Sequence, residues 1–323
     1  MKQGSIVIAG CGNIGRRHLQ ALGGVRRRLR IQVQEVSAAA RASAEEIART
    51  IEHHDIEVVS GPSGTPETVD LLIVATNAGT RREAFEAVAA RAWPTTTLFE
   101  KVLFTTRGDI EAVGGQLRAH GRSAYVNCGR RGFPGYVELR NALRSETVRS
   151  IDVDGARWGL CSNAVHFIDL AEFLTGSRPR ALDASGVDPE PIEAKRDGCI
   201  ELSGTLLGEL DGGTRLRITC TAEDYAAPRI HIATDHADWH VDEVAGVVRR
   251  EPRSASAGSA AAETRPFQTR YVSEMPYLYE ELLDGRSRLP PYDRSAEQHL
   301  LLIDALRRRL GLSIEADEPC PIS

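Results

Sequence analysis

The sequence has few aromatic residues, no long apolar run and no excess of positive charge, and each absence excludes a class of protein. Aromatic residues make up 5% of the 323 residues, and 45 acidic residues outnumber 40 basic ones. A nucleic-acid surface is not expected, because it needs clustered positive charge and, for single strands, rings that stack on bases. No apolar run approaches the roughly 20 residues that cross a bilayer, and the first ten residues lack the apolar core of a secretory signal. We therefore expect a soluble cytoplasmic protein.

Paired cysteines and lysine are also scarce. The six cysteines are scattered and include no C-x-x-C pair, which fits reduced structural thiols better than a disulfide framework. Only three of the 40 basic residues are lysine: Lys2, Lys101 and Lys195. Because arginine is the usual cation of this chain, a lysine marks a position where a compact, titratable ammonium is wanted.

Up to residue 128, short apolar runs alternate with helical patterns. The predicted strands are residues 5–9, 31–36, 56–60, 71–76, 95–100 and 123–128. Helical spacing follows the first, second, fourth and fifth of these runs. Such alternation indicates right-handed crossovers and a parallel sheet covered on both faces. We therefore predict a doubly wound, Rossmann-type α/β domain over residues 1–128.

From residue 129 the pattern changes to longer alternating strands, with a hairpin turn at residues 211–213. In residues 214–222 apolar and polar side chains alternate, so one face packs while the other is wet or forms an interface. We therefore predict a second α/β domain over residues 129–323, with a large, open, mostly antiparallel sheet.

Two other segments of this second half have distinct patterns. Residues 297–311 read as an amphipathic helix that could pack back towards the first domain. Residues 254–263 are rich in serine, alanine and glycine, a composition typical of a mobile connection.

A G-x-G-x-x-G motif, Gly10 to Gly15, lies directly between the first predicted strand and helix. Gly10 allows a tight turn, Gly12 lets a pyrophosphate approach the backbone, and Gly15 lets helix and strand pack closely. The helix N-terminus, with Asn13 and Ile14 in its first turn, adds N–H groups and a positive dipole. This position predicts a dinucleotide-binding turn rather than a purely structural one.

Glu35 strengthens this prediction. It ends the second predicted strand, 20 positions after Gly15, where an acid accepts hydrogen bonds from the adenosine ribose. A carboxylate there repels a 2′-phosphate, so the sequence favours NAD over NADP, although Arg41 is close enough in sequence to reduce that preference.

Further motifs follow in order along the chain. They are Arg16-Arg17-His18, Ala75-Thr76-Asn77, Phe99-Glu100-Lys101, Arg131, Pro134-Gly135-Tyr136 and the Asn163-x-x-His166-Phe-Ile-Asp169 segment. Together they resemble the Gfo/Idh/MocA oxidoreductases, the family of glucose-fructose oxidoreductase and inositol dehydrogenase. The resemblance extends over nearly the whole chain and implies a Rossmann domain followed by a domain for substrate binding and oligomerisation.

The resemblance also implies a reaction, namely hydride transfer between a nicotinamide and a secondary alcohol or ketone. It places Lys101 beside the nicotinamide and substrate, with Thr76, Asn77 and Glu100 in the cofactor site, and it makes His166 the acid/base. An imidazole suits two-way proton transfer because its ordinary pKa is about 6.5. The alternative is that Lys101 is a surface lysine at a strand end and His166 a packed core histidine.

The resemblance suggests substrate contacts in the second domain. We expect Asn163 to hydrogen-bond the substrate. Trp158 either stacks on a sugar ring or packs in the core. Arg131 and Tyr136 likewise either contact the substrate or pack at the domain junction.

Two departures from the family pattern affect these expectations. The family usually has proline after the lysine, often joined through a cis bond, whereas this chain has Val102. We expect either a trans peptide, with the lysine aimed differently, or a strained site. The family often has aspartate four residues before the histidine, where this chain has the neutral Ser162. Asp169, one turn after His166, either orients the imidazole or faces solvent.

A run of histidines and aspartates near residue 236 looks like a metal site but is not interpreted as one. Its members are His231, Asp235, His236, Asp238, His240 and Asp242. Two strands around an Asp/His turn place several of them on one face without converging them. We therefore expect no metal.

The leading hypothesis is an NAD(P)-dependent oxidoreductase that acts on a sugar, polyol or nucleotide sugar, in a surface-polysaccharide sugar pathway. Its expected partners are a small-molecule substrate and a second copy of the chain, in a homodimer or homotetramer formed through the C-terminal sheet. One rival is an NAD-dependent glycosidase or lyase with transient oxidation. Another is a non-enzymatic dinucleotide-sensing protein that retains the glycine turn.

Overall fold

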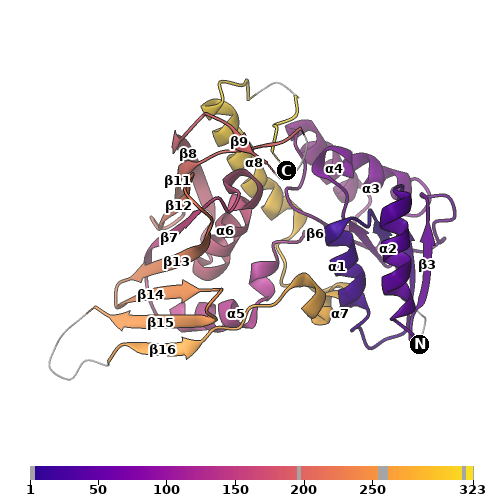
Figure 1. Ribbon diagram of the computed structural model, residues 1–323, viewed down its shortest axis with the longest axis horizontal. Coiled ribbons are helices and arrows are strands. Elements are labelled where there is room, and N and C mark those ends of the chain that lie inside the picture. The colour runs from indigo at the N-terminus through magenta and orange to yellow at the C-terminus, as the bar shows by residue number, and fades with distance from the viewer. Residues whose placement is uncertain (1–3, 195–197, 254–260, 315–317, 323) are drawn as a thin grey trace. The chain divides into compact units, whose positions relative to one another are not determined.

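The computed structural model describes residues 4–194, 198–253, 261–314 and 318–322, and the chain forms two compact units (Figure 1). Unit 1 comprises Met1–Asn127 and Arg270–Ala296, and unit 2 comprises Cys128–Thr269 and Glu297–Ser323. Unit 1 therefore includes a late segment that the sequence-based boundary assigned to the second domain.

Unit 1 is built on a six-stranded parallel sheet with the order β3-β2-β1-β4-β5-β6. Its strands are β1 (Gly4–Ala9), β2 (Leu29–Gln34), β3 (Asp55–Val59), β4 (Leu71–Val74), β5 (Thr96–Phe99) and β6 (Ser123–Val126). Its helices are α1 (Asn13–Leu22), α2 (Ala38–Arg49), α3 (Arg81–Ala89), α4 (Arg107–Ala119) and, from the late segment, α7 (Pro276–Leu283). Every residue of β4 and β5 is buried, as expected for parallel strands covered on both faces.

The strand order of unit 1 reverses between β1 and β4. In open α/β sheets, ligands bind at the carboxyl ends of the strands beside such a reversal. The glycine turn follows β1 and the Thr76 segment follows β4, so the topology brings both motifs to this position.

Unit 2 is built on an eight-stranded sheet with the order β16-β15-β14-β13-β7-β12-β11-β8. Its strands are β7 (Val148–Ala156), β8 (Pro179–Val187), β11 (Gly204–Leu210), β12 (Arg215–Thr221), β13 (Ala226–Thr234), β14 (Ala237–Asp242), β15 (Val247–Pro252) and β16 (Glu263–Pro266). A small ribbon adds β9 (Ile192–Glu193) and β10 (Ile200–Glu201), and the helices are α5 (Pro134–Leu143), α6 (Leu160–Thr175) and most of α8 (Tyr292–Arg309). β7 and β12 pair in parallel, whereas the other neighbouring strands are antiparallel.

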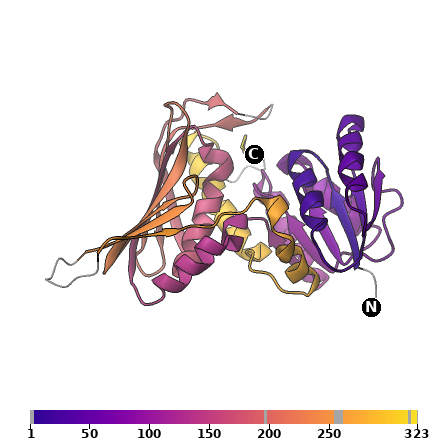
Figure 2. The ribbon, with the colours of Figure 1, turned by 60° about the horizontal axis from the view of Figure 1, so that its bottom comes forward.

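The two faces of this large sheet differ in character. Helices lie against one face and leave the other uncovered (Figure 2). Along β12, Leu216, Ile218 and Cys220 are buried, whereas Arg215 and Arg217 are exposed. The alternation predicted from the sequence is therefore present, except that Ala222 lies beyond the strand and is exposed.

The predicted fold class is confirmed, and several elements were missed. The sequence analysis did not identify α5, α7, β8, β15 or β16, and α8 begins at Tyr292, earlier than predicted. Most of the serine-rich stretch lies outside the described residues. Within the described ranges, no helix has both the length and the apolar character needed to cross a membrane.

Candidate functional site

The glycine turn has the geometry that a dinucleotide needs. Gly10 has a φ of +87°, and a Cβ there would lie 2.7 Å from the Cγ2 atom of Thr76. A Cβ on Gly15 would lie 2.2 Å from the carbonyl oxygen of Gly10, so helix and strand pack too closely for a side chain. At Gly12, which precedes α1, a Cβ would meet nothing within 4 Å. This open position leaves the backbone accessible to a phosphate group.

Glu35 lies directly after β2 and beside this turn. Its carboxylate accepts hydrogen bonds from the backbone N–H groups of Cys11, at 2.6 Å, and Ser37, at 2.8 Å. Arg41 donates to the carbonyl oxygens of Glu35 and Val36. Burial and the neighbouring Glu35 raise the pKa of the Cys11 thiol to about 12, so Cys11 stays protonated at neutral pH and is a packing residue.

A cavity of about 520 Å³ opens beside the turn. The predicted cofactor residues that line it are Gly10, Gly12, Glu35, Thr76 and Asn77. The Oγ1 atom of Thr76 is buried and has no hydrogen-bond partner among the described residues. An open backbone, an acid and an unsatisfied hydroxyl fit the phosphates and ribose of a dinucleotide.

Five other residues predicted for the cofactor site are not among the residues that line this cavity. They are Asn13, Ile14, Gly15, Glu100 and Lys101. Asn13 accepts a hydrogen bond from Arg16 on the exposed start of α1, and Gly15 is buried against Gly10.

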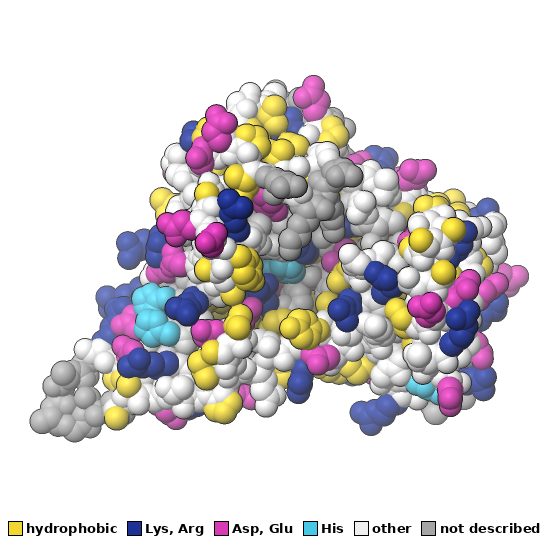
Figure 3. All heavy atoms as spheres, in the orientation of Figure 1, with side chains coloured by type: hydrophobic (Ala, Val, Ile, Leu, Met, Phe, Trp, Pro, Cys, Tyr) yellow, Lys and Arg dark blue, Asp and Glu magenta, His cyan; other side chains and the backbone are white. Residues whose placement is uncertain are grey.

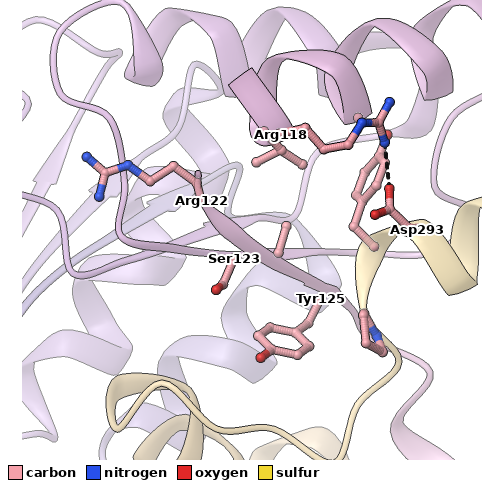
Figure 4. A pocket seen from close by; sticks show the side chains of 10 residues that line it. Arg118, Arg122, Ser123, Tyr125 and Asp293 are labelled. Atoms are coloured by element: carbon pink, nitrogen blue, oxygen red, sulfur yellow. Dashed lines mark hydrogen bonds and ion pairs between the residues drawn. The ribbon is translucent and has the colours of Figure 1, made fainter. Parts of the chain in front are cut away.

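A smaller hollow of about 190 Å³ lies beside β6 (Figure 4). Arg118 of α4 forms an ion pair of 2.8 Å with Asp293 there, and Arg122 points away from that pair. The hollow borders Ser123, at the amino end of β6. Because ligands of parallel α/β sheets bind at the carboxyl ends, this position favours the larger cavity as the cofactor site.

Glu100 lies at the centre of a buried polar cluster, with 5% of its surface exposed. The Oε1 atom accepts hydrogen bonds from Nε2 of His18, at 2.9 Å, and from the amide of Asn127, at 2.5 Å. The Nδ1 atom of His18 lies 2.6 Å from the hydroxyl of Tyr279 on α7. Burial alone would raise the pKa of Glu100, but the hydrogen bonds from His18 and Asn127 and the charge of Arg81 outweigh it and lower the pKa. Glu100 is thus an ionised carboxylate facing the protein interior.

Lys101 follows Glu100 and is half-buried. The Lys101–Val102 peptide is cis, so the trans alternative is wrong. The guanidinium of the fully buried Arg81 donates to the carbonyl oxygens of Val102 and Leu103, and also to that of Thr76. One arginine therefore joins the loop after Lys101 to the segment that lines the cofactor cavity.

In unit 2, His166 and Asn163 lie in the first half of α6, and both are half-buried. The helix begins where Glu201 of β10 accepts hydrogen bonds from the N–H groups of Cys161, at 2.8 Å, and Ser162, at 3.2 Å. A carboxylate at a helix N-terminus is favourable because it meets unpaired N–H groups and the positive dipole end. The amide of Asn163 donates to the carbonyl oxygen of Trp158, at 2.8 Å.

Trp158 has a packing role in this unit. It is 8% exposed, its indole N–H donates to the carbonyl oxygen of Thr219, and its ring packs edge-on against Phe167. Of the two alternatives that the sequence left open, these contacts favour the core.

Arg131 is engaged by Asp169. Its Nε–H donates to one carboxylate oxygen, at 2.7 Å, and a terminal guanidinium nitrogen lies 2.6 Å from the other in an ion pair. The guanidinium also lies near the ring of Phe173. Asp169 is fully buried. Burial raises its pKa, and the charge of Arg131 opposes that rise. The expectation that Asp169 faces solvent is therefore wrong, because its carboxylate is fully buried and holds Arg131.

Tyr136 is also enclosed. It is fully buried, and its hydroxyl donates to Glu243, at 2.6 Å. Arg130 donates twice to the same carboxylate and lies over the ring of Phe167. The phenol, the guanidinium and the carboxylate satisfy one another inside unit 2.

The histidine-rich segment forms a surface patch over β13 and β14 (Figure 3). His231 lies between Asp238, at 2.9 Å, and Asp152, at 3.6 Å, and its ring stacks on that of His240. Arg253 also donates to Asp238. Within the described residues, no group of three or more such side chains could hold a metal ion.

Residues 5–128 match the model of a family described as an oxidoreductase family with an NAD-binding Rossmann fold, Gfo/Idh/MocA. This segment belongs to the Gfo/Idh/MocA family. Over residues 5–128 the match confirms the resemblance seen in the sequence. No curated protein sequence matches the chain.

Solved structures extend the likeness to the whole chain at the level of fold. UDP-N-acetylglucosamine 3-dehydrogenase GnnA from Acidithiobacillus ferrooxidans is 16% identical, with a TM-score of 0.71 over 97% of this chain and 98% of that one. GenD2 from gentamicin A biosynthesis, in complex with NAD, is 16% identical, with a TM-score of 0.71 over 96% and 95%. The transcriptional regulator Gal80p from Kluyveromyces lactis is 14% identical, with a TM-score of 0.74 over 98% and 95%. One fold thus serves a dehydrogenase, an NAD-bound protein of gentamicin A biosynthesis and a transcriptional regulator.

Reasoning from the sequence missed three buried residues near Lys101. His18 was noted as part of a motif but given no role, and Arg81 and Tyr279 were not singled out. The signal that could have found His18 was its position, because it is a polar residue in the apolar stripe of α1. Tyr279 carried none, because its 261-residue separation from His18 is closed by tertiary structure alone.

Proposed function

We propose that the protein is an NAD-dependent oxidoreductase that transfers a hydride between the nicotinamide and a secondary alcohol or ketone carbon of a sugar, polyol or nucleotide sugar. The observation that carries the proposal is the cavity beside the glycine turn, where Gly12 is open and Glu35 and Thr76 supply polar atoms. Around it, residues 5–128 carry the family's Rossmann fold.

In this proposal, the chain holds the cofactor through the turn and the strand ends. The N–H groups at the start of α1 bind the pyrophosphate, Glu35 binds the adenosine ribose, and Thr76 and Asn77 line the path between them. Bound NAD supplies the acceptor for the hydride that leaves the alcohol carbon.

Lys101 and His166 complete the reaction. His166 accepts the hydroxyl proton as the hydride leaves carbon, and the Lys101 ammonium stabilises the negative charge that develops on oxygen. In the reverse direction His166 returns the proton to the ketone oxygen. Asn163, half-buried one turn before His166, is our candidate for a hydrogen bond to the substrate.

The substrate class rests on the resemblance and on two proteins of similar fold. One is a dehydrogenase of a nucleotide sugar and the other belongs to gentamicin A biosynthesis. We therefore put nucleotide-activated sugars first, in a surface-polysaccharide pathway, and free sugars and polyols second.

A screen tests the proposal. The protein is incubated with NAD and each member of a panel of nucleotide sugars, sugars and polyols, and NADH is followed by its absorbance. Net NADH formation with one substrate class supports the proposal. Product formation without net NADH would instead indicate the glycosidase or lyase chemistry, in which oxidation is transient.

The substrate screen has a third informative outcome. NAD binding without turnover of any panel member would overturn the proposal and favour a dinucleotide-sensing protein. The likeness to the regulator Gal80p makes this the specific alternative to the enzyme.

We further propose that two copies associate through the uncovered face of the large sheet, which carries alternating charges such as Arg217, Asp154 and Arg229. Light scattering should show a dimer or tetramer at micromolar concentration. A monomer would contradict this assembly without affecting the proposed reaction.

A further inference from the structure

The peptide that carries Lys101 lies between two buried charged groups. Glu100 precedes it and is 5% exposed, and Arg81, which holds the following loop, is 1% exposed. Burying charge away from water is costly unless its partners are well placed, so both groups must be held by specific contacts.

On the Glu100 side, the contacts form a chain across unit 1. The Oε2 atom of Glu100 accepts the N–H of Lys101, at 3.3 Å, and its Oε1 atom accepts Nε2–H of His18, at 2.9 Å. The other ring nitrogen of His18 meets the hydroxyl of Tyr279, at 2.6 Å. The chain thus connects α7 through α1 to the backbone of Lys101.

His18 uses both of its ring nitrogens in this chain. An ionised carboxylate only accepts, so Nε2 of His18 carries the hydrogen that meets Glu100. Nδ1 lies within hydrogen-bond distance of the hydroxyl of Tyr279. The imidazole therefore joins Tyr279 to Glu100.

On the other side, Arg81 fixes the loop after Lys101. Its guanidinium donates to the carbonyl oxygens of Val102 and Leu103. The same group donates to Thr76, which lines the proposed cofactor cavity. Lys101 is therefore held from both directions by side chains that do not reach that cavity.

We propose that His18 and Tyr279 are positioning residues, which act through Glu100 to fix the backbone of Lys101. The inference rests on the proposed function, because Lys101 is the residue whose position it explains. Neither residue is proposed to touch the reacting atoms. The Glu100 carboxylate transmits the effect of both residues to Lys101.

The scarcity of lysine provides a direct measurement. Labelling the full chain with ¹⁵N-lysine gives three amide signals, from Lys2, Lys101 and Lys195, and Lys101→Arg identifies the one that matters. Tyr279→Phe keeps the ring and removes the hydroxyl. We expect it to shift the Lys101 amide signal and to speed its hydrogen exchange about tenfold, the scale of one lost hydrogen bond.

Tyr292→Phe is the matched control. Tyr292 is also a buried tyrosine of the late segment in unit 1, and its hydroxyl donates to the carbonyl oxygen of Ile110, at 2.8 Å, away from the chain. In this variant we expect the Lys101 amide signal to match that of the unsubstituted protein. His18→Gln, which offers Glu100 an amide donor, should disturb the Lys101 signal less than His18→Leu.

With a substrate from the screen, Tyr279→Phe should lower kcat about tenfold and change NAD affinity by less than about twofold. An unchanged Lys101 amide in Tyr279→Phe, or equal changes in both tyrosine variants, would overturn the inference. An amide change without a loss of kcat would also overturn it. If no panel member reacts with the unsubstituted protein, the proposed function fails, while the amide comparison still decides whether the chain holds Lys101.

Discussion

The buried charges beside Lys101 in unit 1 and two enclosed ion pairs of unit 2 have different surroundings. In unit 1, Glu100 and Arg81 contact main-chain atoms on either side of Lys101, just beyond the carboxyl end of β5. In unit 2, Arg131 and Asp169 satisfy one another, as do Arg130 and Glu243, and phenylalanine rings lie against both arginines.

This difference shows that burial of charge alone does not identify a functional residue. Desolvation makes every such group costly, so each must have partners. When the partner is another side chain, the pair joins elements, as Arg131 and Asp169 do. When the partner is the backbone of a proposed catalytic residue, removing the charge disturbs the site itself.

The largest effect on stability is expected from Asp169→Asn. It would remove the charge that lies nearest to Arg131 and leave Glu172 at 3.9 Å, so the free energy of unfolding should fall by about 3 kcal/mol in urea denaturation. The matched control is Asp211→Asn, at the exposed partner of Arg180, which should cost about 0–1 kcal/mol. Equal losses in the two variants would remove the distinction between buried and exposed pairs in unit 2.

Next come Lys101→Met and His166→Asn. Each should lower kcat by about 100-fold or more while NAD still binds, because both groups act mainly in the transition state. The double variant should lose less than the product of the single losses, since the two serve one reacting oxygen. Near-normal turnover in each single variant would contradict both catalytic assignments. It would favour the alternative, in which Lys101 is a surface lysine and His166 a packed core histidine.

A smaller effect is expected from Glu35→Ala. The carboxylate repels a 2′-phosphate, so the protein should prefer NAD, and removing the charge should narrow the ratio of NADP to NAD dissociation constants by about tenfold. Titrations at moderate salt measure the ratio. Glu45→Ala, which removes an exposed charge from α2, should leave it unchanged. Tighter binding of NADP than NAD by the unsubstituted protein would refute the preference.

The smallest effect concerns Asp238 on the open face of the sheet. Hydrogen bonds from Arg253 and His231, partly opposed by burial, lower its pKa from 3.8 to about 2. A lowered pKa stabilises the fold above pH 3.8, and this stabilisation is lost as the pH falls towards 2. Because the pair is partly exposed, we expect less than about 1 kcal/mol. Melting temperatures between pH 5 and 2 should fall less steeply in Asp238→Asn, and an unchanged slope would contradict this.

Local patterns sufficed for much of unit 1. The glycine spacing defined the turn because Gly10, Gly12 and Gly15 lie within six residues, and Glu35 lies one strand further on. Apolar runs defined the parallel sheet because its central strands, β1, β4 and β5, are buried on both faces. In unit 2, the same kind of reading found the alternation of β12 but not α5, whose first residue, Pro134, was read as part of a motif instead.

The sequence by itself determined the Rossmann turn, the alternation of strands and helices and the identity of the rare Lys101, because these depend on residues close together in the chain. Only the tertiary structure decided which polar residues are partners. Arg131 meets Asp169, Tyr136 meets Glu243 and His18 meets Tyr279 across 38, 107 and 261 residues. No local pattern encodes such pairs, since a buried polar group is satisfied by whatever the packing of distant elements brings within hydrogen-bond distance.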